Sequence, residues 1–163
     1  MRSVVKMQKI YFDTSAICSL FDNSSNTYVV ISLFEFLSKN SSKFRLFISP
    51  IFHYEIDFAS QSLNNKVADV ISQFKIISLP NSFNEIAELL KLYIKQHVLT
   101  EKHLEDLAHI AYASIFSCDY LISCDTKHIV RKKTIELVTN INTPQNIFVP
   151  KIVTPFKFME IFK

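Results

Sequence analysis

Short apolar runs alternate along the chain with longer stretches in which apolar residues recur every three or four positions. Runs of the first kind are typical of buried strands. They occupy residues 9–12, 44–48, 74–79, 120–123 and 152–153. The stretches between them have helical spacing, as at Val29, Val30, Leu33, Phe34 and Leu37. Strands that alternate with helices predict an α/β fold with a parallel sheet.

Polar residues mark the starts of several predicted helices. Ser49-Pro50 and Thr154-Pro155 each place a favourable cap residue before a proline at the first helical position. Ser82 to Glu85 has the spacing of a capping box. We expect the helix that begins at Pro50 to continue through Leu63, and another helix to begin near Lys66.

The 163 residues show no linker, repeat or break in composition, so we expect a single domain over residues 1–163, with 1–8 as a short N-terminal extension. The chain contains no glycine. This excludes the Walker A loop, the Rossmann turn, the kinase glycine loop and the EF-hand, which all require a residue without Cβ. Turns that need a positive φ should therefore fall on Asn or Asp.

Charge and cysteine content narrow the function classes further. A net charge of +3 is too small to indicate nucleic-acid binding by itself. Cys18, Cys118 and Cys124 form no CxxC pair, and their odd number predicts reduced thiols in a cytoplasmic protein. No apolar run approaches the ~18 residues that a membrane span needs. Asp13 interrupts the N-terminal apolar stretch, which argues against a signal peptide.

Two predicted strands end in aspartate, at Asp13 and Asp125. The carboxyl ends of parallel strands are where ligands bind in open α/β sheets. If these two strands are neighbours, their negative charges converge, which is costly unless a cation lies between them. Several carboxylate ligands favour Mg²⁺ or Mn²⁺.

Further carboxylates must come from helices that approach the same edge. The candidates are Glu55, Glu105 and Asp106, and periodicity alone excludes neither Asp22 nor Asp57. Taken singly, each of these acids is more typical of a solvated surface, because charged side chains are mostly exposed.

Five segments, in this order and spacing, resemble the motifs of the PIN domain, and they cover nearly the whole chain from residue 9. They are Ile10-Tyr11-Phe12-Asp13-Thr14-Ser15-Ala16-Ile17, residues 48–56, residues 105–113, residues 119–125 and residues 152–159. Each motif alone is weak evidence for this family, whereas four acidic motifs in this order are fairly specific to it.

The resemblance implies a three-layer α/β/α sandwich around a parallel sheet of about five strands. It also implies a Mg²⁺- or Mn²⁺-dependent endoribonuclease, most often the VapC-like toxin of a type II toxin–antitoxin pair, whose products carry a 5′-phosphate and a 3′-hydroxyl. The partners would be RNA, a cognate antitoxin and a second copy of the chain. The implied acidic quartet and its two hydroxyl helpers are Asp13, Glu55, Asp106, Asp125, Ser15 and Ser123.

Two departures from the family pattern accompany this resemblance. A closely similar subset has Asn at the fourth acidic position, whereas this chain keeps Asp125. Those relatives also tend to have Gly between the last helix and strand, where this chain has residues 140–150 without one. The second departure concerns the loop and not the chemistry.

The two implied hydroxyl helpers, Ser15 and Ser123, have an alternative interpretation as helix caps.

The histidines carry no recognisable metal motif. His103 and His109 are six residues apart, which places them on different faces of a helix, unlike the i, i+4 pair of a zincin. We expect His109 to be a packing residue beside Ala108 and Ala111.

One basic cluster follows Asp125 directly. If the fold is correct, it would lie near the acidic edge and grip the phosphates that flank the scissile one. A solvated helix face explains it equally well. The candidate RNA-binding residues are Lys127, Arg131, Lys132 and Lys133.

Two other function classes stay open. A catalytically silent PIN-like module that binds RNA or protein would keep the basic cluster without needing four acids. A Mg²⁺ phosphohydrolase or receiver-like domain would also use a doubly wound sheet. A dehalogenase-type site, however, requires Asp-x-Asp after the first strand, and Asp13-Thr14-Ser15 lacks it.

Overall fold

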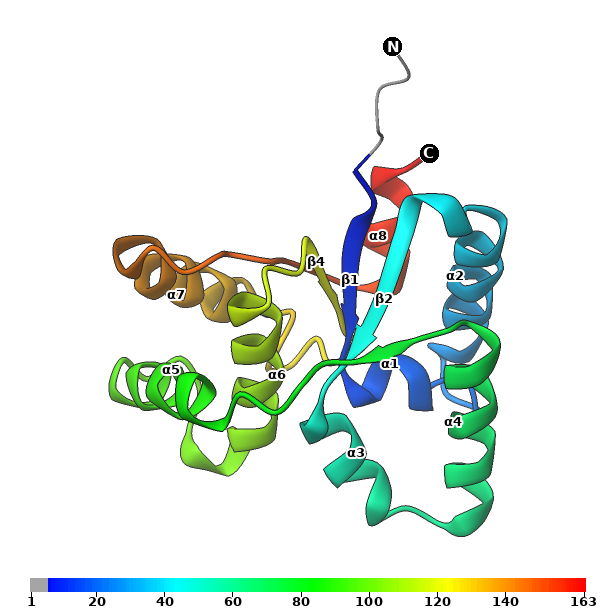
Figure 1. Ribbon diagram of the computed structural model, residues 1–163, viewed down its shortest axis with the longest axis horizontal. Helices are drawn as coiled ribbons and strands as arrows, with labels where there is room; N and C mark the ends of the chain where they lie inside the picture. The colour runs from blue at the N-terminus through cyan, green and yellow to red at the C-terminus, as the bar shows by residue number, and fades with distance from the viewer. Residues whose placement is uncertain (1–5) are drawn as a thin grey trace.

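Five parallel strands form the centre of the computed structural model, which describes residues 6–163 (Figure 1). In sequence order they are β1 (Gln8–Phe12), β2 (Phe44–Ile48), β3 (Ile77–Ser78), β4 (Tyr120–Ile122) and β5 (Lys151–Val153). Their order across the sheet is β3-β2-β1-β4-β5, and every neighbouring pair is parallel. The predicted α/β fold with a five-stranded parallel sheet is confirmed. Within the predicted run 74–79, only Ile77 and Ser78 pair as a strand.

Eight α-helices and three short 3₁₀ helices connect these strands among the described residues. The α-helices are α1 (Thr14–Cys18), α2 (Thr27–Lys39), α3 (Pro50–Asp57), α4 (Gln61–Gln73), α5 (Phe83–Lys95), α6 (Leu104–Ile115), α7 (Lys132–Asn142) and α8 (Pro155–Ile161). The 3₁₀ helices are η1 (Ser41–Lys43), η2 (Glu101–His103) and η3 (Thr143–Gln145). Between residues 6 and 163, no helix has the length and apolar content needed to cross a membrane.

Two details of the helix prediction are wrong. The helix from Pro50 ends at Asp57, and α4 then begins at Gln61. The reason is the hydroxyl of Ser60, which accepts a hydrogen bond from the backbone N–H of Leu63 and so caps a new helix. The helix after Ser82 forms as predicted, but Ser82 makes no side-chain cap bond, so the capping box is absent.

The expected N-terminal extension, residues 1–8, falls mostly outside the described residues. Its last residue, Gln8, is the first residue of β1 and pairs with Phe44 in β2.

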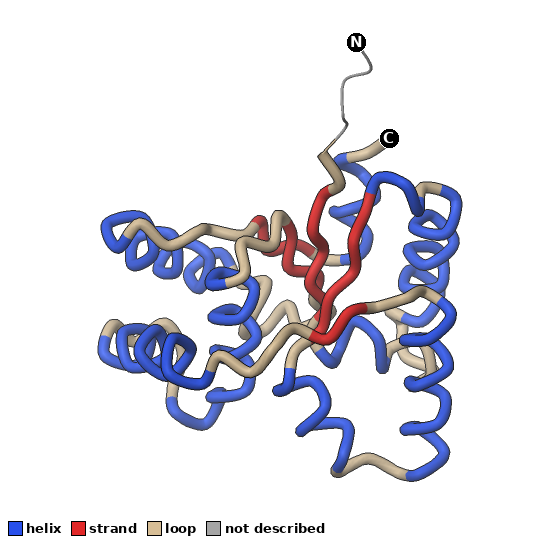
Figure 2. Tube along the Cα trace, viewed as in Figure 1, coloured by secondary structure: helices blue, strands red, loops and turns tan. Residues whose placement is uncertain are grey.

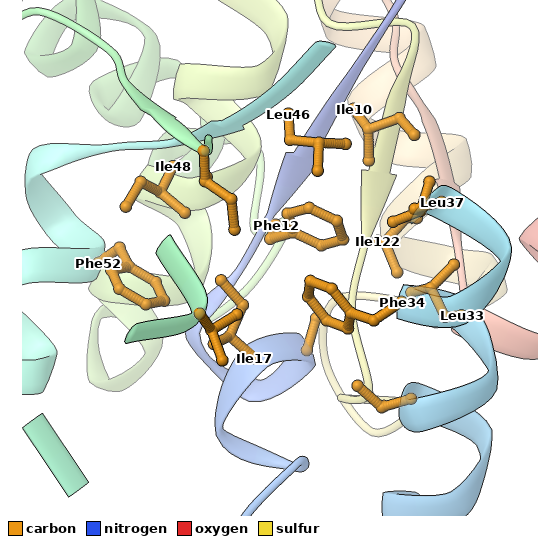
Figure 3. Close-up of a cluster of buried hydrophobic side chains, with 14 of the residues drawn as sticks. Ile10, Phe12, Ile17, Leu33, Phe34, Leu37, Leu46, Ile48, Phe52 and Ile122 are labelled. Atoms are coloured by element: carbon orange, nitrogen blue, oxygen red, sulfur yellow. The ribbon is translucent and has the colours of Figure 1, made fainter. Parts of the chain in front are cut away.

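Helices cover both faces of the sheet and make three layers (Figures 1 and 2). Helices α2, α4 and α8 lie on one face, and α5, α6 and α7 lie on the other. Successive residues of a strand point to opposite faces, so β1 contributes to two cores. Ile10 and Phe12 pack with Phe34 of α2 and Ile122 of β4 (Figure 3), whereas Tyr11 lies in the other core.

Five described residues, none of them glycine, have a positive φ. They are Asn23, Lys75, His97, Ser117 and Asn146. The expectation that such turns fall on Asn or Asp is therefore correct at two positions and wrong at three.

The three exceptions share one geometry. Lys75, His97 and Ser117 follow the C-caps of α4, α5 and α6. After each one, the next residue donates its N–H back to a carbonyl five residues earlier, as from Cys118 to Ala113 over 2.8 Å. This is the Schellman motif. The donating residue is apolar and buried in all three cases, which offsets the cost of the left-handed turn.

The register of the central strands positions the candidate site. Phe12 pairs with Ile122, so the next residues, Asp13 and Ser123, lie beside each other at the carboxyl ends of β1 and β4. The next strand in sequence, β2, lies on one side of β1, and β4, which comes later in the chain, lies on the other side. Ligands bind in open α/β sheets at such a switch point.

Candidate active site

Asp13 is buried at the end of β1, with 3% of its surface exposed. Its carboxylate accepts hydrogen bonds from the Ser15 hydroxyl at 2.8 and 2.9 Å, from the Ser123 hydroxyl at 2.6 Å and from the Ala16 N–H at 2.9 Å. The last bond makes Asp13 the N-cap of α1. Asp13 thus performs a structural task at the place where a metal ligand is predicted.

The predicted hydroxyl helpers, Ser15 and Ser123, join β1 to the loop after β4. The Ser15 hydroxyl accepts from the N–H of Cys124, and the Ser123 hydroxyl accepts from the N–H of Asp125, both over 2.9 Å. Their two oxygens lie 3.3 Å apart. Neither serine caps a helix, so their contacts fit the role of holding Asp13 better than the alternative interpretation as caps.

Burial raises the pKa of Asp13, and the positive potential of His109 and the hydrogen bonds of the two serines only partly offset this effect. The folded chain therefore disfavours the ionised form of this carboxyl group. A cation bound beside Asp13 would reverse that balance.

Glu55 approaches the same edge from α3. Its Oε2 atom accepts a hydrogen bond from Thr14 and lies 2.7 Å from Nε2 of His109. Burial raises the pKa of Glu55, but the hydrogen bond and charge of His109 and the bond from Thr14 outweigh it, so the pKa is lowered overall. Both contacts use the same oxygen, and among the described residues Oε1 keeps its capacity to bind another group.

His109 is more than the packing residue that we expected. It is 1% exposed, and its Nδ1 atom lies 2.6 Å from the hydroxyl of Tyr11, which in turn lies 2.6 Å from the hydroxyl of Ser49. A chain of hydrogen bonds therefore runs from the core to Glu55 through His109. The sequence offered one unused signal, a tyrosine between the apolar residues Ile10 and Phe12 of a predicted buried strand, because a buried tyrosine hydroxyl needs a partner.

Asp106 and Asp125 form the other half of the site. Burial raises the pKa of Asp106, and the negative charge of Asp125 raises it further, while nearby histidines lower it. Asp106 extends from the first turn of α6. We expected like charges to converge between Asp13 and Asp125, whereas the like-charge interaction that raises a pKa here joins Asp125 to Asp106 on α6.

Asp125 also organises its own loop. Its Oδ1 atom accepts from the N–H groups of Lys127 and His128 at 2.9 and 3.0 Å, and its Oδ2 atom lies 2.9 Å from Nδ1 of His128. His128 was not predicted to belong to the site. Its position depends on the loop conformation, which the sequence does not reveal.

The four predicted acids are linked by electrostatic interactions, three of them with one histidine. The charge of His109 acts on Asp13, Glu55 and Asp106, while Asp106 and Asp125 act on each other. Of the alternative acids, Asp22 and Asp57 are exposed. Glu105 is half-buried and makes no ion pair within the described part of the chain, so Asp106 is the better candidate on α6.

No family model and no curated protein matches the chain. Among solved structures, the chain is similar to one chain of the crystal structure of VapBC2 from Rickettsia felis bound to a DNA fragment from their promoter. The TM-score is 0.56 and the sequence identity 14%, and the similarity covers 90% of this chain and 98% of the other. The two chains share a fold.

The side chains of the basic cluster do not all face the same part of the surface. All four of its residues are exposed. Arg131 and Lys133 line a pocket of about 240 Å³ that His103 and His128 also line. Lys132, in contrast, lies 3.7 Å from Glu136 on the outer surface of α7.

The three cysteines take no part in this chemistry. Burial raises the pKa of Cys118 to about 12 and that of Cys18 and Cys124 to about 11. Thiols with such values are poor nucleophiles at neutral pH. All three cysteines are free, Cys118 buried and the other two half-buried, in agreement with the prediction of reduced thiols.

Proposed function

We propose that this protein is a Mg²⁺- or Mn²⁺-dependent endoribonuclease of the PIN class, and that it acts as the VapC-like toxin of a toxin–antitoxin pair. One observation carries the proposal. At the switch point of a parallel sheet, a buried aspartate and a pair of mutually repelling aspartates converge, at the positions that the PIN resemblance selects. The similar fold of a chain from a VapBC2 complex supports the same class.

The residues fit a hard divalent cation. Asp13, Asp106, Asp125 and Glu55 offer only oxygen ligands, which Mg²⁺ and Mn²⁺ prefer. Burial raises the pKa of Asp13 and of Asp106, and the charge of Asp125 raises that of Asp106 further, so a bound cation would stabilise the ionised form of both carboxyl groups. A bound cation would lower the pKa of a water molecule and neutralise charge on the attacked phosphate.

The surrounding side chains hold these carboxylates in place. Ser15 and Ser123 fix both oxygens of Asp13, and His109 fixes one oxygen of Glu55. Catalytic and metal-binding groups are held in this way by hydrogen bonds to their neighbours. In our proposal Ser15 and Ser123 position Asp13 and the water beside it.

RNA would be held by the basic residues near α7. Arg131, Lys132 and Lys133 lie at the N-terminus of this helix, where the helix dipole disfavours positive charge. The helix dipole therefore does not account for these residues, and in our proposal they bind phosphate. With Lys127, they would contact phosphates on either side of the scissile bond.

We further propose an antitoxin and a second copy of the chain as protein partners. The similar chain comes from a complex described as VapBC2 on promoter DNA. Tyr54 of α3 and Phe58, the C-cap of that helix, support a protein contact, because they are 53% and 75% exposed and stack edge to face at 5.0 Å. They flank Glu55, so a partner bound here would adjoin the active site.

One observation favours the silent binding module as a second candidate. Asp13 caps α1 and Asp125 caps its own loop, so both aspartates have structural roles that need no metal. A module of this kind would bind RNA through Arg131 and Lys133 without cleaving it.

A cleavage assay separates the two candidates. A single-stranded RNA is incubated with the full chain in Mg²⁺, in Mn²⁺ and in EDTA, with Asp106→Asn as the test variant and Glu105→Gln as its control. The control removes one negative charge from the adjacent residue of the same helical turn. We expect cleavage only with metal, loss of cleavage in Asp106→Asn and wild-type rates in Glu105→Gln. RNA binding without cleavage in either metal would refute the nuclease and favour the silent module.

A further inference from the structure

We propose that His103, Asp106 and His128 form a binding site for a borderline divalent cation such as Zn²⁺, beside the proposed Mg²⁺/Mn²⁺ site. Because Asp106 belongs to both sites, a Zn²⁺ ion there would compete with the catalytic metal and inhibit cleavage. The inhibition rests on the proposed function, whereas the binding site does not.

The three side chains already point at one another. The Oδ2 atom of Asp106 lies 3.2 Å from Nδ1 of His103 and 3.8 Å from Nδ1 of His128. One candidate ligand atom from each residue lies within 4.8 Å of the other two. Ligands around a tetrahedral zinc ion, each ~2.0–2.1 Å from the metal, are about 3.4 Å apart. Small side-chain movements would therefore suffice to bind the ion.

The two imidazoles lie side by side next to carboxylates. Their ring centroids are 3.9 Å apart with an angle of 32° between the planes. Nδ1 of His103 lies 3.2 Å from Oδ2 of Asp106, and Nδ1 of His128 lies 3.8 Å from the same oxygen and 2.9 Å from Oδ2 of Asp125. A single cation between the two nitrogens and Asp106 would thus find three ligand atoms that already lie close together.

The backbone around the site is well supported, which limits the cost of ordering the ligands. His103 ends η2 and directly precedes α6, and Asp106 lies in the first turn of that helix. The loop that carries His128 is held by Asp125 and by the Thr134 hydroxyl, which donates to the His128 carbonyl over 2.6 Å.

The site is also open to solvent. The side chains of His103, Asp106 and His128 are 31%, 23% and 35% exposed, and both histidines line the pocket near α7. An ion can therefore reach the site without unfolding of the chain.

The ligand types select the metal. Two imidazole nitrogens and one carboxylate suit Zn²⁺, or Co²⁺ as its substitute, better than Mg²⁺, which prefers oxygen ligands. Three protein ligands leave a fourth tetrahedral position for water. Nδ1 of His128 would give up its 2.9 Å hydrogen bond to Asp125 Oδ2 when it binds the ion, and the negative charge of Asp125 would stay beside the site.

Binding is tested by calorimetric titration of ZnCl₂ into the untagged full chain. We expect one ion per chain, and a loss of affinity in His103→Ala and in His128→Ala that exceeds the 10–100-fold typical for a supporting residue. His97→Asn is the control, because His97 lines the same pocket but lies outside the cluster. Thermal melts check that each variant is folded. Unchanged Zn²⁺ affinity in folded His103→Ala and His128→Ala would overturn the site.

Titration with Co²⁺ distinguishes these ligands from cysteine. Tetrahedral Co²⁺ with nitrogen and oxygen ligands gives visible absorption without an intense thiolate charge-transfer band. The presence of that band would overturn the assignment, since it would mean that a cysteine binds the ion.

The competition has its own readout. We expect Zn²⁺ to inhibit metal-dependent RNA cleavage in wild type and in His97→Asn, and to inhibit His103→Ala at least roughly tenfold more weakly. Equal inhibition of His103→Ala would refute the competition. Asp13→Asn should still bind Zn²⁺ although it lacks the proposed catalytic carboxylate. Zn²⁺ binding in a chain that never cleaves RNA would therefore support the site while refuting the proposed function.

Discussion

Two substitutions of Asp13 separate its proposed catalytic role from its structural role. Asn keeps the shape and the capping oxygen but removes the charge, whereas Ala removes all of these. We expect both variants to lose metal-dependent cleavage. We expect only Ala to lose stability.

The expected magnitudes follow from the contacts of Asp13. Asn caps helices as well as Asp does, and its amide can donate to the hydroxyls of Ser15 and Ser123. Because burial raises the pKa of Asp13, removal of its charge relieves a cost at neutral pH. Asp13→Asn should therefore leave the free energy of unfolding unchanged or increase it in the absence of metal.

The Ala variant leaves the hydrogen-bond donors of Asp13, namely the Ala16 N–H and the hydroxyls of Ser15 and Ser123, without this partner. Loss of the cap on α1 costs about 1 kcal/mol. Ser15 and Ser123 lie 3.3 Å apart, so one hydroxyl can donate to the other, and one hydroxyl remains unpaired at a cost of about 1–3 kcal/mol. Asp13→Ala should thus be less stable than Asp13→Asn by about 2–4 kcal/mol.

Urea denaturation without metal measures both differences, provided that the slopes with denaturant are equal. Repeating it with Mn²⁺ at a hundred times its Kd should stabilise wild type by about 2.7 kcal/mol and Asp13→Asn by less. An Asn variant that unfolds like the Ala variant, or that cleaves RNA at the wild-type rate, would refute this account of Asp13.

Three further predictions address the rest of the site. Tyr11→Phe should destabilise the protein by about 1–3 kcal/mol in urea, because it leaves two buried hydrogen-bond partners unpaired; an unchanged stability would contradict the chain of bonds. The pKa of Glu55 is lowered by folding, so its contribution to stability is present above its ordinary pKa and lost as the pH falls through the folded value. Glu55→Gln should therefore lose less stability than wild type in melts below about pH 4.5, and identical pH profiles would argue against the ionised contact. Replacing Arg131 and Lys133 with Ala should reduce the slope of log affinity against log salt by roughly 0.7 per lost contact with single-stranded RNA. Lys91→Ala serves as the control and should leave the slope unchanged, because Lys91 lies on α5, outside the basic cluster, and pairs with Glu88.

Much of the fold could be predicted because its signals are local. The run Phe44 to Ile48 is bounded by polar residues and forms a strand with those bounds. Thr154 before Pro155 gives a cap, and its hydroxyl accepts from the N–H of Lys157. The break between α3 and α4 was missed, because a cap by Ser60 competes with a hydrophobic periodicity that continues through it.

Of the candidate site, the sequence predicts mainly the acidic residues that follow predicted strands. Asp13 and Asp125 follow apolar runs, so the sequence places them at one edge of a parallel sheet. The contacts of His109 and His128 depend on tertiary packing. His109 reaches Tyr11 across 98 positions of the chain, and no periodicity records a pairing of that kind.

The Schellman turns that end α4, α5 and α6 without glycine have a consequence for how the protein folds. Glycine normally stops a helix through its own backbone preference, before any tertiary structure exists. At Lys75, His97 and Ser117 the local sequence supplies no such preference, and the turn is held by the burial of the following residue. In the unfolded chain, nascent α4, α5 and α6 have no local signal to end there. Their C-terminal boundaries are therefore set late, when the two cores close on the sheet, and helix length in this protein is a product of cooperative folding.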